Sequence, residues 1–589
     1  MEHLRVWAPA AREVGVKSDG ALRAMERVEG GWWEAKDFPL KHGKGYAFVL
    51  DGKKPVADPR SAWQPEGVEG PSRILDHSLF PWTDNAWQTP PLSSALVYEI
   101  HTGTFTPEGT FRSIEDHLDH LLDLGITHIE LMPVNAFPGS RGWGYDGVNL
   151  YAPYEPYGGP EGLKHLVDTC HARGIGAILD VVYNHLGPAG NYLDWFGPFY
   201  SNRYHTPWGR ALNFDGEGSH EVRRFFCDNA LMWLRDYHFD GLRLDAVHAI
   251  YDRSALHFLE QLAEEVRGLE SQIGRHLFLI AESDLNDPKI VQRPEIGGYG
   301  MHAQWSDDFH HSLHTVLTGE KTGYHRDFGS LSDLAKSLKS AFVYDGRFSP
   351  FRDRRHGRPI RMLSGHNFLA YLQNHDQIGN RARGERSGQL LGVGRLKIAA
   401  ALVLTSPFIP MLFQGEEWGA STPFQYFTDH QDPELGKAIS KGRQEEFSAF
   451  GWNPDEIPDP QAVETFEGSK LEWAERESEP HRSILEWHKR LIRIRRTIPD
   501  LTDGRLDRVQ TRFDEEEKWF WVQRGIVAVV CNLAVRAQRV AIPSAWSTVL
   551  LTSDSEVDMA EGCITMPSDS VAILKAKKGM ELAFPQSVR

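Results

Sequence analysis

The middle of the chain, residues 91–499, alternates between short apolar runs and amphipathic helical patterns. Apolar strands separated by helices predict a parallel sheet, because the crossover between parallel strands needs about a dozen residues or more. Two of the helical patterns, 113–124 and 161–173, are each followed by a glycine, Gly125 and Gly174, the residue that commonly ends a helix. The eight apolar runs are 96–100, 126–133, 176–182, 239–244, 277–281, 301–305, 368–373 and 408–413.

Eight such units fit a closed (β/α)8 barrel, or TIM barrel. The alternative is an open doubly wound sheet, which normally carries a glycine-rich phosphate-binding turn after its first strand. The first run here leads instead into residues 101–107, HTGTFTP, which lack that turn. We therefore predict an α/β fold with a (β/α)8 barrel.

Both ends of the chain are β-like. We predict an N-terminal β-sandwich over 1–90, ending in the proline-rich connection 81–91, then the catalytic barrel over 91–499 and a C-terminal β-sandwich over 500–589. Two insertions interrupt the barrel. One, at 186–218, is rich in aromatic residues, and the other, at 318–366, holds the basic run 352–358, which we interpret as a solvated loop.

Charge and cysteine content exclude several classes of protein. The 64 basic and 81 acidic residues give a net charge of −17, which argues against nucleic acid or an anionic membrane as partner, since both attract a basic surface. The four cysteines are too scattered for a disulfide framework or a zinc motif. No secretory signal is recognisable, and the apolar stretch 398–413 is interrupted by Pro407 and Pro410, so a buried helix and strand are expected there. A cytoplasmic protein is predicted.

Acidic and imidazole side chains stand at the ends of four predicted strands. An aspartate in such a place can simply cap a helix, but four acidic strand ends directed at one barrel mouth repel one another unless function or a cation uses them. The residues are Asp180 and His185 at the end of the third run, Arg243, Asp245 and His248 at the end of the fourth, Glu282 and Asp284 at the end of the fifth, and His375 and Asp376 at the end of the seventh.

Two carboxyl groups that flank one bond suit glycoside cleavage. Arg243 lies two residues before Asp245, so both side chains face the same side of a strand, and a guanidinium keeps a neighbouring carboxylate ionised for nucleophilic attack. Glu282 follows an apolar strand, where burial raises a carboxyl pKa as a general acid requires. His185 and His375 are suited to hydrogen-bond sugar hydroxyl groups.

A metal-dependent barrel hydrolase is the alternative from a different class. Such sites usually bring two or more histidines together on one element, whereas the first strand offers only His101. The insertion at 186–218 contains Asp194, Asn213 and Asp215 but no dense run of oxygen ligands like a calcium loop. We predict no cofactor and no required metal, and we rank a non-catalytic carbohydrate-binding protein lower still.

The four strand-end segments resemble, in order and position, the motifs of the α-amylase superfamily, glycoside hydrolase family 13. The resemblance implies a retaining mechanism with a covalent glycosyl-enzyme and main carboxyl groups about 5–5.5 Å apart. It implies that Asp245 is the nucleophile, Glu282 the general acid/base and Asp376 a third acid that holds the substrate. It places Arg243, His185 and His375 around the cleaved sugar, makes Asp180 the structural acid of the first motif, and makes Tyr145 a ring that stacks on that sugar.

Within this superfamily the chain is similar, over essentially its full length, to the branch of the trehalohydrolases. The segments concerned are 98–109, 186–193, 206–209, 304–311 and 374–381. The implied substrate is maltooligosyl trehalose or a related α-glucan, cut at the α-1,4 bond next to the terminal trehalose. Glucan branching or debranching at α-1,6 points is the alternative, although Gln377 and Asn380 differ from the branching pattern.

Two further interpretations concern substrate contacts outside the motifs. Trp208, in the aromatic insertion, is a candidate sugar-binding platform. The N-terminal sandwich resembles a starch-binding module, but we interpret it as a brace against the barrel.

For the oligomeric state, a monomer is favoured over an oligomer.

Overall fold

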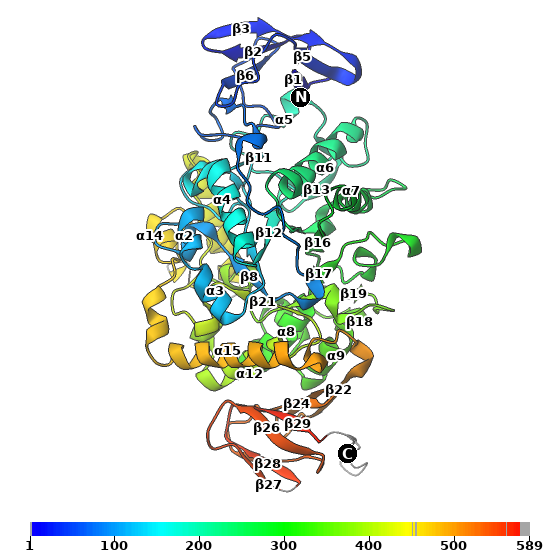
Figure 1. Cartoon of the computed structure of the whole chain (residues 1–589), viewed down its shortest axis with the longest axis vertical. Helices are drawn as coiled ribbons and strands as arrows, with labels where there is room; N and C mark the ends of the chain where they lie inside the picture. Colours follow the sequence, from blue (N-terminus) through cyan, green and yellow to red (C-terminus); the bar gives the residue numbers. More distant parts are fainter. Residues whose placement is uncertain (1–2, 450–451, 454–455, 561, 578–589) are drawn as a thin grey trace.

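The computed structural model describes residues 3–449, 452–453, 456–560 and 562–577. Figure 1 shows three parts along the long axis of the molecule. Two N-terminal sheets lie at one end, a barrel with its surrounding helices forms the middle, and two C-terminal sheets lie at the other end.

The eight predicted apolar runs form one closed parallel barrel, which confirms the predicted fold. The last strand closes the ring by pairing with the first, Met411 opposite Val97. Every residue of these strands is buried, as expected for strands packed on both faces. The strands are β8 Val97–Ile100, β9 His128–Leu131, β12 Gly176–Val181, β15 Gly241–Leu244, β16 Phe278–Ala281, β17 Ala303–Trp305, β20 Phe368–Ala370 and β21 Ile409–Phe413.

The inward face of the barrel changes from apolar to polar along each strand. Val97, Ile178 and Ile280 belong to one buried apolar cluster that fills the barrel. Side chains two positions further along a strand share the same face, so Glu99 and Asp180 stand above Val97 and Ile178 at the carboxyl end. The strand alternation therefore places charge at one mouth of the barrel.

The helices around the barrel mostly follow the predicted pattern, with one break. The expected helix over 113–124 is two helices, α2 Phe111–Glu115 and α3 Leu118–Leu124, the second of which ends at Gly125 with φ +100°. The apolar stretch 398–413 supplies the end of α12 Val393–Leu404 and the strand β21, as predicted. The other long helices are α4 Gly159–Ala172, α6 Ser219–Asp236, α7 Phe258–Ile273, α8 Asp307–Thr318, α13 Pro433–Ala449 and α15 His481–Thr497.

Both insertions contain a β-hairpin. The first holds the short helix α5 Leu193–Phe196 and the hairpin β13 Tyr200–Thr206 with β14 Gly209–Leu212. The second holds a 3-10 helix, η8 Gly323–Asp327, the helix α9 Leu331–Ser340, and the hairpin β18 Asp345–Ser349 with β19 Arg354–Gly357.

The prediction that the basic run 352–358 is a solvated loop is wrong for part of its length. His356 is buried in β19, and its Nε2 lies 2.6 Å from the carbonyl oxygen of Asp284. A guanidinium nitrogen of Arg352 lies 3.7 Å from the Asp284 carboxylate. The hairpin therefore contacts the loop after the fifth barrel strand, a long-range contact that local charge density does not reveal.

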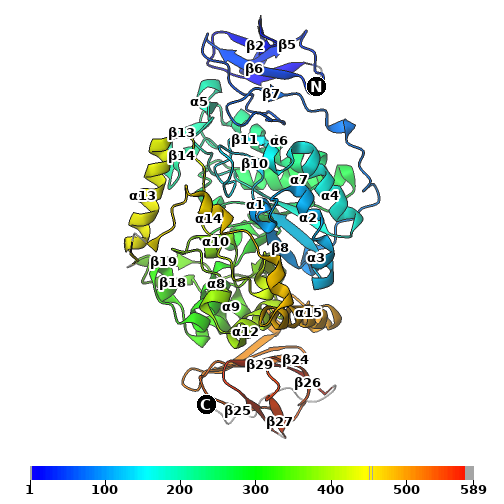
Figure 2. The same ribbon diagram turned by 90° about the vertical axis from the view of Figure 1, so that its left-hand side faces the viewer.

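The N-terminal sheets pack against the first insertion rather than standing apart (Figure 2). Trp7 meets Phe199 with ring centroids 5.6 Å apart, and Phe48 meets Phe196 at 6.4 Å. These contacts support the interpretation of the sandwich as a brace. Its strands are β1 Leu4–Trp7, β5 Trp32–Ala35 and β4 Glu26–Arg27 in one sheet, and β3 Ala21–Ala24, β2 Val14–Ser18, β6 Gly45–Leu50 and β7 Ser72–Arg73 in the other.

The C-terminal sheets dock on α12, where Arg395 pairs with Asp569 at 2.9 Å. One sheet contains β22 Val509–Asp514, β23 Trp519–Arg524, β24 Val527–Asn532, β29 Ser570–Ala576 and β26 Trp546–Thr552. The other contains β25 Gln538–Ala541, β28 Cys563–Met566 and β27 Asp558–Ala560. In the part of the chain that the structure describes, no helix has the length and apolar character needed to span a membrane.

Candidate active site

The buried guanidinium of Arg243 connects three of the carboxyl groups singled out in the sequence. Its Nη1 donates to Asp180 Oδ2 at 2.5 Å and to Asp245 Oδ1 at 3.1 Å, and its Nη2 donates to Glu282 Oε2 at 2.7 Å. The side chain of Arg243 is 1% exposed. A planar fork that satisfies several carboxylates at once is a geometry that arginine offers and lysine does not.

The register of the barrel strands explains this meeting. Asp180 on β12 pairs with Arg243 on β15, and Arg243 pairs with Ile280 on β16. Asp245 comes two positions after Arg243, and Glu282 comes two positions after Ile280. Both side chains therefore point to the inside of the barrel. The structure thus brings together the residues that the spacing predicted to face one another.

Asn184 and Ala246 fix the two carboxyl groups further. The Asn184 side-chain amide donates to Asp245 Oδ2 at 2.7 Å, so each oxygen of Asp245 accepts an N–H hydrogen bond. Ala246 has φ +39°, a left-handed conformation that costs a non-glycine residue roughly 1–2 kcal/mol. In this conformation its N–H donates to Glu282 Oε2 at 2.8 Å.

The electrostatic setting of Glu282 suits a proton donor. Burial raises the pKa of this carboxyl group above its ordinary value and the charge of Asp245 raises it further, while Arg243 opposes both. Oε2 already accepts two N–H hydrogen bonds, so the proton belongs on Oε1. The Glu282 side chain is 16% exposed, and that of Asp245 is 11% exposed, so both reach the surface of the barrel mouth.

A chain of hydrogen bonds runs from Glu99 through His375 to Tyr145. The Glu99 carboxylate pairs with His375 Nδ1 and accepts its backbone N–H at 3.0 Å. Burial lowers the pKa of His375, but the charge and hydrogen bond of Glu99 together with the charge of Asp376 raise it, so the net shift is upward. His375 Nε2 lies 2.8 Å from the Tyr145 hydroxyl, which donates to Asp180 Oδ2 at 2.5 Å. This chain fixes the orientation of both rings, which stack with centroids 5.2 Å apart.

Gly144 is required to place Tyr145. It has φ +96°, and a Cβ atom there would lie 2.1 Å from the carbonyl oxygen of Pro133. Neither the backbone conformation nor the space admits a side chain. The turn that carries Tyr145 into the site therefore depends on this glycine.

His185 and Trp208 form a second ring pair at the edge of the site. Their rings stack at 4.9 Å with an interplanar angle of 16°, and His185 Nε2 lies 3.1 Å from the Tyr145 carbonyl oxygen. Burial lowers the pKa of His185 to about 4, so the imidazole is neutral near pH 7. Trp208, at the tip of the β13–β14 hairpin, remains 49% exposed. An exposed indole fixed by a stack offers an apolar surface to a sugar ring.

Asp376 lies in the first turn of α10 His375–Gly379 and belongs to the same electrostatic system. Burial raises its pKa, and the charge of Glu282 raises it further against the opposing charge of His375. Asn380 donates to Asp376 Oδ1 at 2.7 Å. Among the described hydrogen bonds, none joins Asp376 to Arg243. The Asp376 carboxyl group is therefore less constrained than those of Asp245 and Glu282.

Sequence reasoning missed several residues that complete the site. Glu99 and Asn184 are polar residues in or next to barrel strands, but nothing in the sequence alone indicates their roles. Trp305 lies with its ring 4.1 Å from the Arg243 guanidinium. Asp307 accepts a hydrogen bond from the Tyr371 hydroxyl at 2.5 Å, and burial raises its pKa to about 8. The signals for Asp307 are its position just after the sixth strand and its place in the family-like segment 304–311.

Within the described residues, two groups of side chains are close enough to hold a metal ion: His310, His311 and His325, and His314, Glu320 and His325. Neither contains Asp245, Glu282 or Asp376. The carboxyl groups of the candidate active site are instead held by nitrogen donors of the protein.

Comparisons with known proteins agree with this geometry. The family Alpha-amylase, described as the alpha amylase catalytic domain, matches residues 77–207. The malto-oligosyltrehalose trehalohydrolase of Rhizobium sp. is 47% identical over 579 residues, covering 97% of this chain and 97% of the relative. The chain belongs to the malto-oligosyltrehalose trehalohydrolase family. It is a glycoside hydrolase, and the resemblance found in the sequence is confirmed.

Other matches fit this family placement. A solved structure of a putative alpha amylase from Salmonella typhimurium superimposes with a TM-score of 0.90 at 36% identity, covering 98% of this chain and 97% of that one. A 1,4-alpha-glucan branching enzyme of Salinibacter ruber is 32% identical over 394 residues, but the match covers only 57% of this chain. The branching alternative is therefore the weaker one.

Proposed function

We propose that this member of the trehalohydrolase family cleaves the α-1,4 bond next to the terminal trehalose of a maltooligosyl trehalose, releasing trehalose and a maltooligosaccharide. The names of its relatives supply the substrate. The observation that supports this reaction is that the Arg243 guanidinium donates hydrogen bonds to both Asp245 and Glu282 and so holds the two carboxyl groups side by side. Two carboxyl groups held together in this way suit a retaining double displacement.

In the first step Asp245 attacks the anomeric carbon of the glucosyl unit that precedes trehalose. The bond from that carbon to the glycosidic oxygen breaks, and protonated Glu282 gives its proton to this oxygen. Trehalose leaves as a neutral alcohol, and a glycosyl ester of Asp245 remains. Because its pKa is raised, Glu282 can carry the proton that this step requires.

In the second step the ionised Glu282 takes a proton from water, which attacks the anomeric carbon and breaks the ester bond to Asp245. Glu282 is protonated again and Asp245 is free. The maltooligosaccharide leaves with its original anomeric configuration.

The remaining residues are proposed to hold the sugar. Asp376 accepts hydrogen bonds from hydroxyl groups of the glucosyl unit being cleaved, and the ring of Tyr145 stacks on that unit. Trp208 serves as a platform at the edge of the site, because its indole is exposed and fixed on His185. Asp180 positions Arg243 and Tyr145 and does not react.

The cellular setting and assembly are also proposals. Release of free trehalose fits a role in trehalose biosynthesis in the cytoplasm. We propose that the enzyme acts as a monomer and that residues 1–90, 91–499 and 500–589 form its three domains.

Product analysis tests the proposed reaction. Purified enzyme is incubated with a trehalose-capped maltooligosaccharide, and products are separated by chromatography and examined by proton NMR at early times. Free trehalose and an α-configured maltooligosaccharide are expected. New α-1,6 linkages, or release of glucose or maltose without trehalose, would reject the proposal.

Treatment with a chelator distinguishes hydrolysis by carboxyl groups from a metal-dependent reaction. Initial rates are compared before and after removal of divalent ions, at a temperature well below unfolding. We expect rates to agree within about twofold, since none of the three carboxyl groups is part of a candidate metal site. Loss of activity that is restored by a divalent ion, while the thermal unfolding of the stripped protein is unchanged, would favour the metal-dependent alternative.

A further inference from the structure

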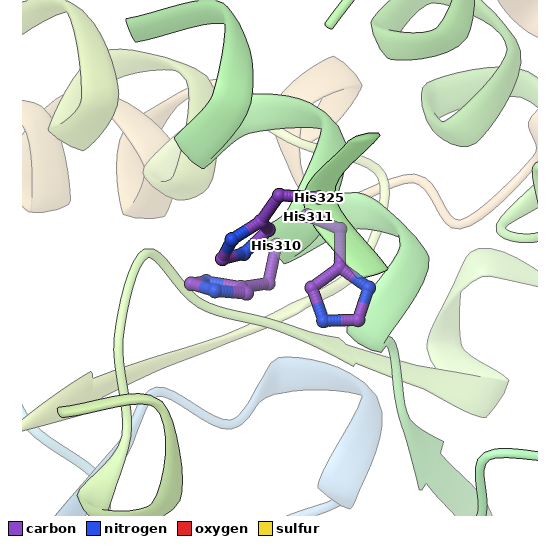
Figure 3. Close-up of side chains that lie close together, drawn as sticks. All are labelled: His310, His311 and His325. Atoms are coloured by element: carbon purple, nitrogen blue, oxygen red, sulfur yellow. The ribbon is translucent and has the colours of Figure 1, made fainter. Parts of the chain in front are cut away.

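Three histidines outside the candidate active site lie close together in the interior (Figure 3). His310 and His311 belong to α8, and His325 belongs to the 3-10 helix η8 that follows it. All three are buried, and one ring nitrogen of each lies within 4.8 Å of the others. Clustered imidazoles of this kind are unusual in a core, where apolar side chains would pack without polar nitrogen atoms to satisfy.

The ring nitrogens of this cluster are incompletely satisfied. His325 Nε2 and His311 Nδ1 are buried without a hydrogen-bond partner. His310 Nδ1 lies 2.6 Å from the carbonyl oxygen of Leu372, so this nitrogen carries the hydrogen and Nε2 bears the lone pair. A histidine held through one nitrogen by a backbone carbonyl, with the other free, is the arrangement found in metal ligands.

The three rings are neutral near pH 7, as ligands must be. Burial lowers the pKa of His325 to about 3 and holds those of His310 and His311 well below their usual range. Neighbouring histidines lower them further. The geometry leaves nitrogens open to an ion: His310 Nδ1 is held by the Leu372 carbonyl oxygen, and His311 Nδ1 and His325 Nε2 have no hydrogen-bond partner.

We propose that His310, His311 and His325 bind one divalent transition-metal ion of the zinc class. Three imidazoles without a carboxylate suit zinc, cobalt or nickel rather than magnesium or calcium, which prefer oxygen ligands. In a tetrahedral zinc site with bonds of about 2.0–2.1 Å, ligand nitrogens lie roughly 3.3–3.4 Å apart. Because the nitrogens lie within 4.8 Å of one another, rotation and small shifts of the rings need to close the spacing by at most about 1.5 Å.

The overlapping group of His314, Glu320 and His325 is the less suitable site. Glu320 Oε2 already lies 2.8 Å from an Arg381 nitrogen and 2.9 Å from His314 Nε2. A cation there would be repelled by the Arg381 guanidinium and would have to displace it from its carboxylate. The three-histidine group requires no ion pair to break.

The position of this cluster indicates what the ion would do. Tyr324, next to His325, has its ring 4.5 Å from those of both His311 and His325. Its hydroxyl lies 3.4 Å from the side-chain oxygen of Gln377, the neighbour of Asp376. An ion shared by α8 and η8 would fix the segment that carries Tyr324 beside the candidate active site. This role is structural, and no step of the sugar chemistry passes through it.

Metal titration of the full-length protein tests the proposal. The protein is stripped with a chelator, transferred to chelator-free buffer and titrated with zinc, cobalt or magnesium chloride by calorimetry. One zinc ion per chain is expected, with no measurable magnesium binding. Cobalt is expected to give visible absorption bands of a four- or five-coordinate nitrogen-ligated site.

Matched variants assign the ligands. His310→Gln, His311→Gln and His325→Gln are each expected to weaken zinc binding at least about 100-fold. His165→Gln, which changes an exposed histidine on α4, is expected to bind as the unchanged protein does. Loss of binding in His314→Gln with retention in His310→Gln would overturn the assignment, as would the absence of stoichiometric zinc binding in the unchanged protein.

A crystallographic arm covers variants that fail to fold. Crystals of the unchanged protein are soaked in zinc, and anomalous scattering locates the ion. A peak between the three imidazoles supports the proposal. A peak only on surface histidines, or none, would refute it.

Discussion

Replacing Arg243 tests the central support of the site. Arg243→Lys keeps the charge but replaces a fork that reaches Asp245 and Glu282 from two nitrogens with a single ammonium group. Arg243→Leu removes both the charge and the hydrogen bonds while keeping an apolar side chain next to Trp305.

The expected loss follows from the hydrogen bonds removed. A hydrogen bond to a charged group contributes about 1.5–3 kcal/mol, and about 1.4 kcal/mol is a tenfold change in rate. Loss of one such bond in Arg243→Lys is therefore expected to lower kcat/KM roughly 10- to 150-fold. Loss of the hydrogen bonds to both Asp245 and Glu282 in Arg243→Leu is expected to lower kcat/KM roughly 10²- to 10⁴-fold.

The pH dependence gives an independent readout. Glu282 must be protonated to act as the acid, so its pKa governs the alkaline limb of kcat/KM. Burial raises that pKa and Arg243 opposes the rise, so removing the guanidinium moves the pKa upward. The alkaline limb of Arg243→Leu is therefore expected at higher pH than that of the unchanged enzyme, and that of Arg243→Lys at an intermediate or unchanged position.

The assay measures trehalose release from a trehalose-capped maltooligosaccharide across pH, with thermal unfolding recorded for each protein. Arg495→Lys is the control, because Arg495 is also buried but donates to the backbone carbonyls of Leu404, Ser406 and Phe408. It should lose stability without a shift in the pH profile. An Arg243→Lys enzyme within threefold of the unchanged one, or an alkaline limb that moves to lower pH in Arg243→Leu, would refute the reasoning.

Four further changes test single parts of the argument. Asp245→Asn should fold normally, as judged by circular dichroism, yet lose several orders of magnitude in turnover because the nucleophile is removed; a mild effect would mean that another carboxylate attacks the sugar. Glu282→Gln should lose hydrolysis of the natural bond but retain much more activity on a glycosyl fluoride, whose leaving group needs no proton; equal losses on both substrates would argue against the acid role. Trp208→Ala should raise KM about tenfold and change the free energy of unfolding by less than about 0.5 kcal/mol, since the indole is 49% exposed; an unchanged KM would remove the platform from the proposal. Gly144→Ala should destabilise the protein by at least about 1–3 kcal/mol and lower activity, whereas Gly268→Ala on the exposed face of α7, where a Cβ meets nothing within 4 Å, should be neutral or stabilising in denaturant unfolding; similar results for both would show that the turn can relax.

The sequence predicts the barrel well because its signal is local. Each strand is a short apolar run with a helix after it, and the spacing of Arg243 and Asp245 places both on one side of a strand. The strand-end position likewise predicts that Glu282 lies nearby. These inferences need no knowledge of distant contacts.

What the sequence does not predict depends on partners far away in the chain. Glu99 is an acid inside an apolar strand, and its role becomes clear only through His375, 276 residues later. The basic run 352–358 has the composition of a solvated loop, and its partner, Asp284, lies on another barrel loop, so composition alone does not reveal the contact. His310 and His311 stand in the family-like segment 304–311, but the sequence does not predict their cluster, since its third member, His325, comes from a separate helix.

The contacts of Trp7 and Phe48 with the first insertion have a consequence for how this enzyme can be altered. Lys54 Nζ also donates to the Tyr192 hydroxyl of the same insertion at 2.6 Å. The N-terminal sheets therefore contact the base of the insertion whose hairpin tip carries Trp208. Trimming the N-terminal sheets is therefore expected to loosen the hairpin tip that carries Trp208, the proposed sugar platform.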